Sequence, residues 1–296
     1  LASLLLLFVA ITLGLEHFGR NRARYTHNER RQALHTYPLK GFRAWGAVAL
    51  CCTVLGLAFV LPAGQLVLWV INTGARELDA SYLEFLGHTL GLAAAASIAT
   101  VVIALLLAMV KRLPGSQWMQ RWQRLAVRIA TLGYAVPGSV LAVGIMLTLT
   151  WLDRSLLASY VVSLFALLFA YVIRFLAVAH APVESGLQRI RPSVIDAARS
   201  LGAKPARLLK QLYIPMLWPG LLTAAILVFV DVMKEMPATL MMRPFGWDTL
   251  ALRIYQFTAE GQWERAALPA LTLLLAGLIP VILLVKNSRK TVAAGS

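Results

Sequence analysis

The chain has 296 residues, of which 59% are hydrophobic and 14% charged, and its formal net charge is +15. This composition excludes a soluble globular domain, whose surface needs far more polar side chains. A basic excess is typical of nucleic-acid binding and also of loops held at an anionic membrane surface. In so apolar a chain the membrane accounts for the charge better, and we expect no nucleic-acid partner.

The chain contains seven stretches of 15 or more residues without Asp, Glu, Lys or Arg: 1–15, 44–75, 85–110, 129–152, 155–173, 211–230 and 266–285. A helix needs about 20 apolar residues to cross a bilayer. The last six therefore qualify as spans, and the span at 155–173 is long enough if it continues past Arg174. We expect residues 1–15, which begin without Met, to be the tail of a span that belongs to a preceding half. A signal peptide is the alternative, but a basic first region and a cleavage site are missing.

The segments that separate these stretches are alternately rich and poor in basic residues. The segments 16–43, 111–128, 174–210 and 286–296 hold 22 Lys and Arg, whereas the segments 76–84, 153–154 and 231–265 hold 6. Basic loops stay in the cytoplasm, so we expect the first set and the C-terminus to be cytoplasmic. Arg174 is then expected to anchor the cytoplasmic end of the fourth full span.

The segment that joins the fourth and fifth full spans predicts two short helices. Pro192 and Ser193 begin the first, with Ser193 as its cap and Asp196 three positions later, as in a capping box. Its apolar face consists of Val194, Ala197, Ala198 and Leu201. Gly202 is expected to end it in the left-handed conformation, and Pro205 to begin the second helix, whose apolar side holds Leu208, Leu209, Leu212 and Tyr213. Such a pair of helices could bind in a groove on a protein or lie on the lipid headgroups of the membrane surface.

Three charged residues follow the fifth full span. Asp231, Lys234 and Glu235 lie at its outer end, where spacings of three and four place Lys234 and Glu235 on the face of Asp231. Ionisable groups this close to hydrocarbon usually face water or the protein interior. They are candidates for a gate or a polar lining for a cationic substrate, and equally for an ion pair at the interface.

The outer segment that contains these charges, 231–265, is too long for a hairpin connection. Asp248 is expected to cap a helix within it, which Gly261 would end. This element could dock a soluble partner or form a packed lid.

No chemistry-bearing cluster is apparent in the chain. Cys51 and Cys52 are adjacent and cannot be bridged, and the five histidines show no ligand spacing. No nucleophile and base stand at workable spacing, and no phosphate-binding loop of the form GxxxxGK[ST] occurs. We therefore expect no enzyme activity, no metal and no cofactor bound by this chain.

The cytoplasmic segment resembles a known motif. Asp196, Ala197, Ala198, Gly202 and the run Leu212, Ile214, Pro215 match the spacing of the EAA loop of ABC importer permeases. In this sequence Asp replaces the first Glu of the motif, and Leu and Ile replace Ile and Leu.

The resemblance implies an all-α integral membrane protein of a bacterial inner membrane, with a six-span type I ABC importer permease core and one additional partial span before it. The loop, 184–215, would dock as a coupling helix into ABC ATPase subunits, which use ATP and Mg. A periplasmic substrate-binding protein and a second permease half are the other implied partners, besides membrane lipid. The expected domains are a partial span 1–15, a basic cytoplasmic linker 16–43, a permease domain 44–286 and a cytoplasmic tail 287–296.

A second resemblance narrows the substrate. The stretch 234–271, which begins KEMPATLMMRP, is similar to the corresponding region of ferric-iron ABC permeases, which usually fuse two halves in one chain. The chain would then be the C-terminal half of such a protein and import ferric iron. Thiamine and polyamine permeases share this architecture. An ion-coupled secondary transporter is the alternative from another class, but it has no reason to carry the helix, glycine, helix loop.

Overall fold

The computed structural model describes residues 39–73, 78, 80–110, 117–152 and 160–293. The chain divides into two units, residues 1–75 and residues 76–296. Every regular element of the described residues is a helix, which confirms the all-α prediction. The partial span predicted at 1–15 and nearly all of the linker predicted at 16–43 lie outside the described residues.

The first unit contains one long apolar rod. It consists of α2 (Phe42–Leu55), a π-helical turn (Gly56–Val60) and α3 (Leu61–Thr73), which together form a candidate span of 32 residues. In the π turn the Leu61 N–H donates to the Gly56 carbonyl. Pro62 follows at once and has no N–H, so the regular hydrogen-bond ladder is interrupted at this point.

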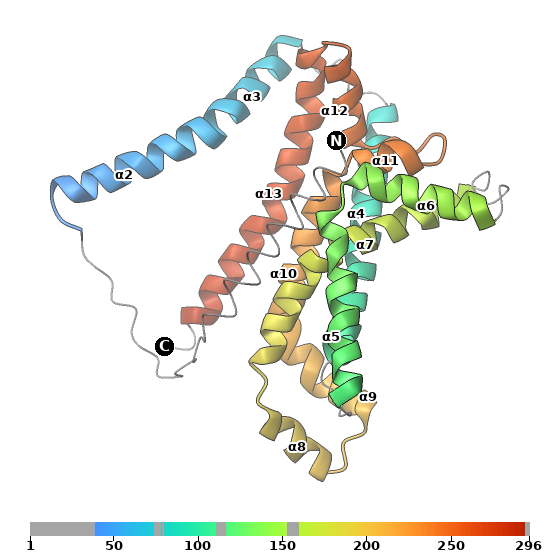
Figure 1. Ribbon diagram of the computed structural model, residues 1–296. Helices are drawn as coiled ribbons and strands as arrows, with labels where there is room; N and C mark the ends of the chain where they lie inside the picture. Colours follow the sequence, from blue (N-terminus) through green and yellow to red (C-terminus); the bar gives the residue numbers. More distant parts are fainter. Residues whose placement is uncertain (1–38, 74–77, 79, 111–116, 153–159, 294–296) are drawn as a thin grey trace. The chain divides into compact units, whose positions relative to one another are not determined.

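The second unit is a bundle around three long helices, α4 (Ala80–Val110), α7 (Tyr160–Gln188) and α10 (Ile214–Met233) (Figure 1). Alanines of α4 are fully buried at this contact: Ala93, Ala96, Ala104 and Ala108. Small side chains let membrane helices approach closely. The helices α7 and α10 approach closely, since a Cβ on Gly220 would lie 2.9 Å from the Pro182 carbonyl oxygen.

The third predicted span, 129–152, is not one straight helix. It is divided between α5 (Gln117–Thr131), a 3₁₀ turn (Leu132–Ala135) and α6 (Gly138–Leu152), and the two arms are bent by 115°. Val136 is extended and precedes Pro137, a residue that disfavours helix before it and donates no hydrogen bond. The sequence stretch was apolar throughout, so its length predicted a span, but its Pro and Gly residues mark the bend.

The outer segment folds into two short helices, α11 (Pro237–Met242) and α12 (Leu250–Ala259). The predicted cap Asp248 is wrong: Thr249 is the capping residue, and its hydroxyl accepts from the Leu252 N–H. Asp248 instead forms an ion pair with Arg243. Gly261 has a φ of +75° and follows the end of α12, as predicted.

The start of α12 is docked on α4. The His88 ring of α4 stacks on Trp247 with centroids 4.4 Å apart. The Thr89 hydroxyl accepts a 2.9 Å hydrogen bond from the Leu250 N–H and donates to the Phe85 carbonyl. The outer segment is therefore packed structure attached to the bundle.

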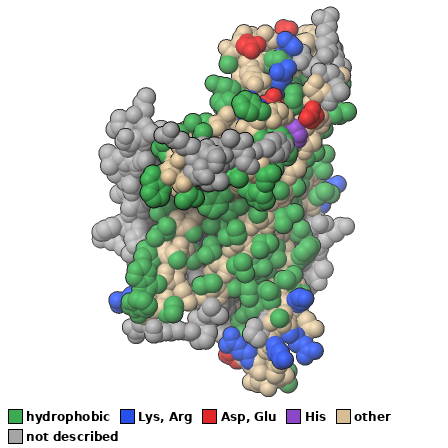
Figure 2. Space-filling view, turned by 90° about the vertical axis from the view of Figure 1, so that its right-hand side faces the viewer, with side chains coloured by type: hydrophobic (Ala, Val, Ile, Leu, Met, Phe, Trp, Pro, Cys, Tyr) green, Lys and Arg blue, Asp and Glu red, His purple; other side chains and the backbone are tan. Residues whose placement is uncertain are grey.

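The last helix, α13 (Trp263–Ala293), runs beside α10 and α12. The described residues contain five helices long and apolar enough to cross a membrane, or six if α5 and α6 together count as one bent span. This agrees with the six full spans predicted. Figure 2 shows hydrophobic side chains over the middle of one face, with Lys and Arg gathered at its lower end.

Candidate functional site

The EAA-like loop forms a short exposed helix, α8 (Pro192–Ser200), at one end of the bundle (Figure 1). The predicted capping box is absent, because the N-cap residue is Arg191 and no side chain caps the helix. Pro192 supplies the first turn instead, with its fixed φ. Asp196 and Ala197 are exposed, whereas Ala198 packs against the core.

Among the described residues, most of the predicted apolar face of α8 is exposed, although Ala198 packs against the core. Leu201 is 88% exposed and Val194 40% exposed, and only the neighbouring Ile195 is buried against the bundle. Gly202 then turns the chain with a φ of +77°, and its N–H donates to the Arg199 carbonyl. The loop thus presents apolar side chains beside basic ones at the exposed end of the unit.

The second helix of the loop is the first part of a span. The short helix α9 (Pro205–Leu208) continues through a π turn (Leu209–Tyr213) into α10, so that Ala206–Met233 forms a single candidate span of 28 residues, about 42 Å long. Leu212, Ile214 and Pro215 lie where the π turn passes into α10, and the Ile214 N–H donates to the Leu209 carbonyl. Leu208 and Tyr213 are buried, as their predicted apolar side requires.

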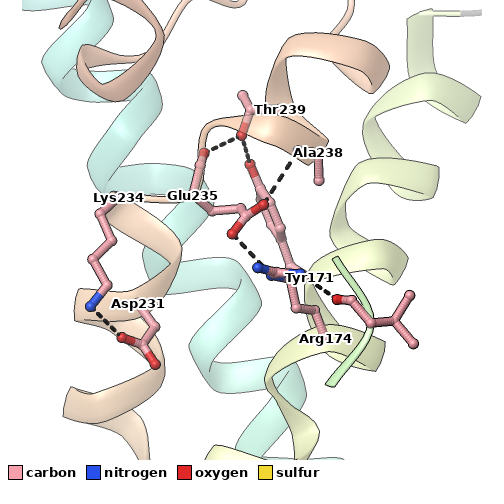
Figure 3. Close-up of polar contacts among 8 residues, drawn as sticks. Tyr171, Arg174, Asp231, Lys234, Glu235, Ala238 and Thr239 are labelled. Atoms are coloured by element: carbon pink, nitrogen blue, oxygen red, sulfur yellow. Dashed lines mark hydrogen bonds and ion pairs between the residues drawn. The ribbon is translucent and has the colours of Figure 1, made fainter. Parts of the chain in front are cut away.

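The far end of this rod leads to a buried ion pair. Glu235 follows α10, and its Oε2 lies 3.0 Å from the Nε of Arg174 in α7 (Figure 3). The Glu235 side chain is 6% exposed and that of Arg174 20%. The other carboxylate oxygen of Glu235 accepts a hydrogen bond from the Ala238 N–H in the first turn of α11. A negative charge at this end of a helix is favoured by the helix dipole.

Arg174 also holds the bend between α5 and α6. Its Nη1 donates a 2.7 Å hydrogen bond to the Val136 carbonyl, which the bend leaves outside a helical ladder. One guanidinium, carried by the middle of α7, therefore joins two places where a helix is interrupted or ends: the bend at Pro137 and the turn from α10 to α11. We call this set of Arg174, Glu235, Val136 and Gly138 the helix junction.

Two hydroxyls close the junction on the side of α11. The Tyr171 hydroxyl lies 2.6 Å from the Thr239 hydroxyl, and the latter donates to the Glu235 carbonyl at 2.5 Å. Since the single Thr239 proton is used there, Tyr171 is the donor to Thr239. Both residues are buried. Four elements are thus tied by polar bonds at one place, where an unpaired group would be costly.

Arg174 is not the cytoplasmic anchor that the sequence suggested. The helix α7 continues for 14 residues beyond it, to Gln188, within the candidate span Val161–Gln188. The signal was available in the sequence: an arginine with apolar residues on both sides needs an intramembrane partner. That partner, Glu235, is distant in the chain and could not be chosen by spacing.

The predicted charge trio is split between two pairs. Asp231 and Lys234 form an ion pair of 2.8 Å, in which Lys234 is 67% exposed. Glu235 turns away from them to Arg174 (Figure 3). Each carboxylate is therefore balanced by its own cation. Among the described residues, no three His, Cys, Asp or Glu side chains are placed to hold a metal ion.

The buried Glu235 follows the end of α10, whose level in the bundle is given by its contact with α13. A Cβ on Gly277 would lie 3.7 Å from the side chain of Val230, and Gly277 is near the middle of the candidate span Trp263–Lys286. The end of α10 is thus opposite the middle of α13. Arg174 is likewise near the middle of the candidate span Val161–Gln188, and ionisable side chains at such positions usually serve function.

Gly138 has no room for a side chain in the helix junction. A Cβ there would collide with the Glu235 Oε1 and lie 3.3 Å from the Arg174 guanidinium. We expect Gly138→Ala to destabilise the protein by about 1–3 kcal/mol, the usual cost of overpacking. Gly144→Ala in the same helix is the control, because nothing lies within 4 Å of that position. Thermal unfolding of both purified variants checks this, and equal midpoints would refute the tight packing at Gly138.

A family model covers most of the second unit. The model of the binding-protein-dependent transport system inner membrane component matches residues 100–292, which include α8, the rod and the helix junction. The chain belongs to this family. It is a multi-pass inner-membrane permease of the ABC transporter class, and the family transports substrates rather than catalysing reactions.

Curated relatives of this permease have different stated substrates. It is 28% identical over 240 residues to the Fe(3+)-transport system permease protein FbpB 2 of Haemophilus influenzae, covering 79% of this chain and 45% of that protein. It is 26% identical over 230 residues to the putative 2-aminoethylphosphonate transport system permease protein PhnV of Salmonella typhimurium, covering 78% and 81%. The permease thus spans less than half the length of the first relative.

Solved structures share the fold of this permease. A chain of a bacterial ABC transporter involved in the import of the acidic polysaccharide alginate matches with a TM-score of 0.67 and 11% identity, covering 83% of this chain and 95% of that chain. A chain of the MetNI methionine ABC transporter matches with a TM-score of 0.51 and 22% identity, covering 72% and 95%. The six-span importer permease fold predicted from the sequence is therefore confirmed.

Proposed function

We propose that this permease forms half of the membrane pathway of an ATP-driven importer, with α8 as its contact to a separate ATPase. The observation that carries the proposal is the open apolar face of α8, which includes Val194 and Leu201. Basic side chains of Arg199 and Lys204 flank it and are exposed. A short helix with such a face fits a groove on a partner protein.

The rod that begins in the loop supplies the mechanical link. Because α9, the π turn and α10 form one helical element from Pro205 to Met233, a movement at the start of this rod is carried to the turn that holds Glu235. Rigid-body movement of packed helices is how many transporters alternate between open states. The helix junction at the far end is thus the proposed gate region, with Asp231, Lys234 and Glu235 as candidate pathway residues.

Ferric iron is the proposed substrate, delivered by a periplasmic binding protein. The stated substrate of FbpB 2 supports it, as does the resemblance of the segment 234–271. The paired carboxylates of Asp231 and Glu235 do not offer the several hard oxygen ligands that this ion prefers. A pathway that releases its cargo needs only weak contacts, and tight binding of iron is the task of the binding protein in this proposal.

We expect cells that express this permease with its ATPase and binding protein to accumulate radioactive ferric iron, at least tenfold above cells without the permease. The host lacks its own iron uptake system, and a variant ATPase that binds but does not hydrolyse ATP is the control. Accumulation of 2-aminoethylphosphonate in place of iron would contradict ferric iron as the substrate, but the proposed importer function would stand. Uptake of iron that persists with the inactive ATPase would contradict ATP-driven transport.

A further inference from the structure

The helix α5 carries an exposed apolar face with a basic edge that the importer function does not use. Its apolar face consists of Trp118, Trp122, Leu125 and Ile129, which recur at helical spacing and are all exposed. The opposite side, with the buried Val127, packs on α7. The apolar stripe therefore points away from the bundle.

A basic edge runs along this stripe. Arg121 and Arg128 are exposed and seven residues apart, so they lie on one side of α5. Among the described residues, neither guanidinium has an ion-pair partner. A helix with aromatic and aliphatic residues on one face and arginine at its edge is typical of contact with the headgroup region of a bilayer.

The depth of the tryptophans agrees with this location. The end of α5 touches α7 beside the helix junction, because Gly133 packs on the Ile173 carbonyl. With a rise of 1.5 Å per residue, Trp122 lies about 16 Å further along the helix axis from Gly133. Half the hydrocarbon thickness is about 15 Å, so a helix that starts at mid-depth and follows the bilayer normal reaches the headgroup layer over this distance. The two indoles, Trp118 and Trp122, contact each other edge to face with centroids 5.7 Å apart.

We propose that this face of α5 is a binding site for anionic phospholipid. The indoles and aliphatic side chains contact the upper acyl chains, and Arg121 and Arg128 bind the phosphate of the headgroup. Arg128 lies deeper in the bilayer and reaches the headgroup with its long side chain. Such a site accounts for the two arginines that lie beside the tryptophan pair on α5.

Quenching by brominated lipids tests the proposal on the full chain in vesicles. The chain has 8 tryptophans, so the signal of interest is the quenching lost in Trp118→Phe with Trp122→Phe. We expect brominated phosphatidylglycerol to quench these two indoles at lower mole fraction than brominated phosphatidylcholine, by about fivefold for each arginine near the surface. Symmetric vesicles make the result independent of the orientation of the chain.

The arginine variants decide the outcome. Arg121→Gln with Arg128→Gln should remove the preference for phosphatidylglycerol while quenching of Trp118 and Trp122 persists. Arg189→Gln, at the exposed end of α7, is the matched control and should leave the preference unchanged. Equal quenching by both lipids would overturn the headgroup site. Absence of quenching by either lipid would show that protein or water covers α5 and would overturn the proposal, while the importer function would stand.

Discussion

Replacing Arg174 with Met should destabilise the permease by about 3–5 kcal/mol, because it leaves the buried Glu235 carboxylate without its cation. Arg174 is bound to Glu235 at 3.0 Å and to the Val136 carbonyl at 2.7 Å. The variant therefore loses both an ion pair and the bond that holds the bend between α5 and α6. Thermal unfolding of the purified protein in detergent, with the yield of folded protein, measures the loss.

A second substitution separates the charge from the packing. Glu235→Gln retains an oxygen that can accept from the Ala238 N–H but removes the buried charge. We expect the double variant Arg174→Met with Glu235→Gln to recover at least half of the stability lost in Arg174→Met. Purely additive losses would show that the two side chains do not interact.

Asp231→Asn is the control for the effect of burial, because it removes an ion pair that is more exposed than the pair of Arg174 and Glu235. Its partner Lys234 is largely exposed, so loss of this pair should cost less than about 1 kcal/mol. Transport by the stable double variant then tests the gate region. A folded double variant that transports at the normal rate would leave the helix junction with a structural role alone.

Replacing Gly202 with Ala should uncouple transport from ATP hydrolysis more than it lowers stability. The left-handed φ of +77° costs a non-glycine residue about 1–2 kcal/mol. The strain falls on the turn between α8 and the rod, and relaxation of the turn changes the direction in which α8 points. We expect a several-fold loss of uptake per ATP hydrolysed in vesicles that contain the permease and its ATPase.

The permease contains a matched position for this experiment. Gly246 has a φ of +80° and, like Gly202, has nothing within 4 Å of an added Cβ. Gly246→Ala therefore imposes a similar backbone strain at the other end of the bundle. Equal coupling ratios in the two variants would contradict the role of the loop, whereas a defect confined to Gly202→Ala would support it.

Local chemistry made the loop and the spans predictable. Gly202 adopts a left-handed conformation that few other residues adopt, so the turn lies where expected. Pro205 favours the first turn of a helix, and α9 begins there as expected. The length of the apolar stretches was enough to locate the long helices of the bundle. Side-chain caps were less predictable: Ser193 and Asp248 are suitable residues, but Arg191 and Thr249 occupy the cap positions.

The helix junction could be anticipated only in part. The depth of Arg174 in an apolar segment indicates that it needs a partner, and Glu235 was already a candidate pathway residue. Their pairing depends on the 115° bend and on the place where α10 ends against α13. These are tertiary features, and no periodic pattern in the chain records them.

In the proposed importer, the close contact of Gly220 with the Pro182 carbonyl is a point about which the rod from α9 to α10 would tilt. Gly220 stands near the centre of the candidate span Ala206–Met233, and a stiff lever held there tilts its two ends in opposite senses through similar distances. In the proposed importer, a push on the loop in one direction would then move Glu235 in the opposite direction. Position 220 accepts glycine at this contact, since a Cβ there would lie 2.9 Å from the Pro182 carbonyl oxygen.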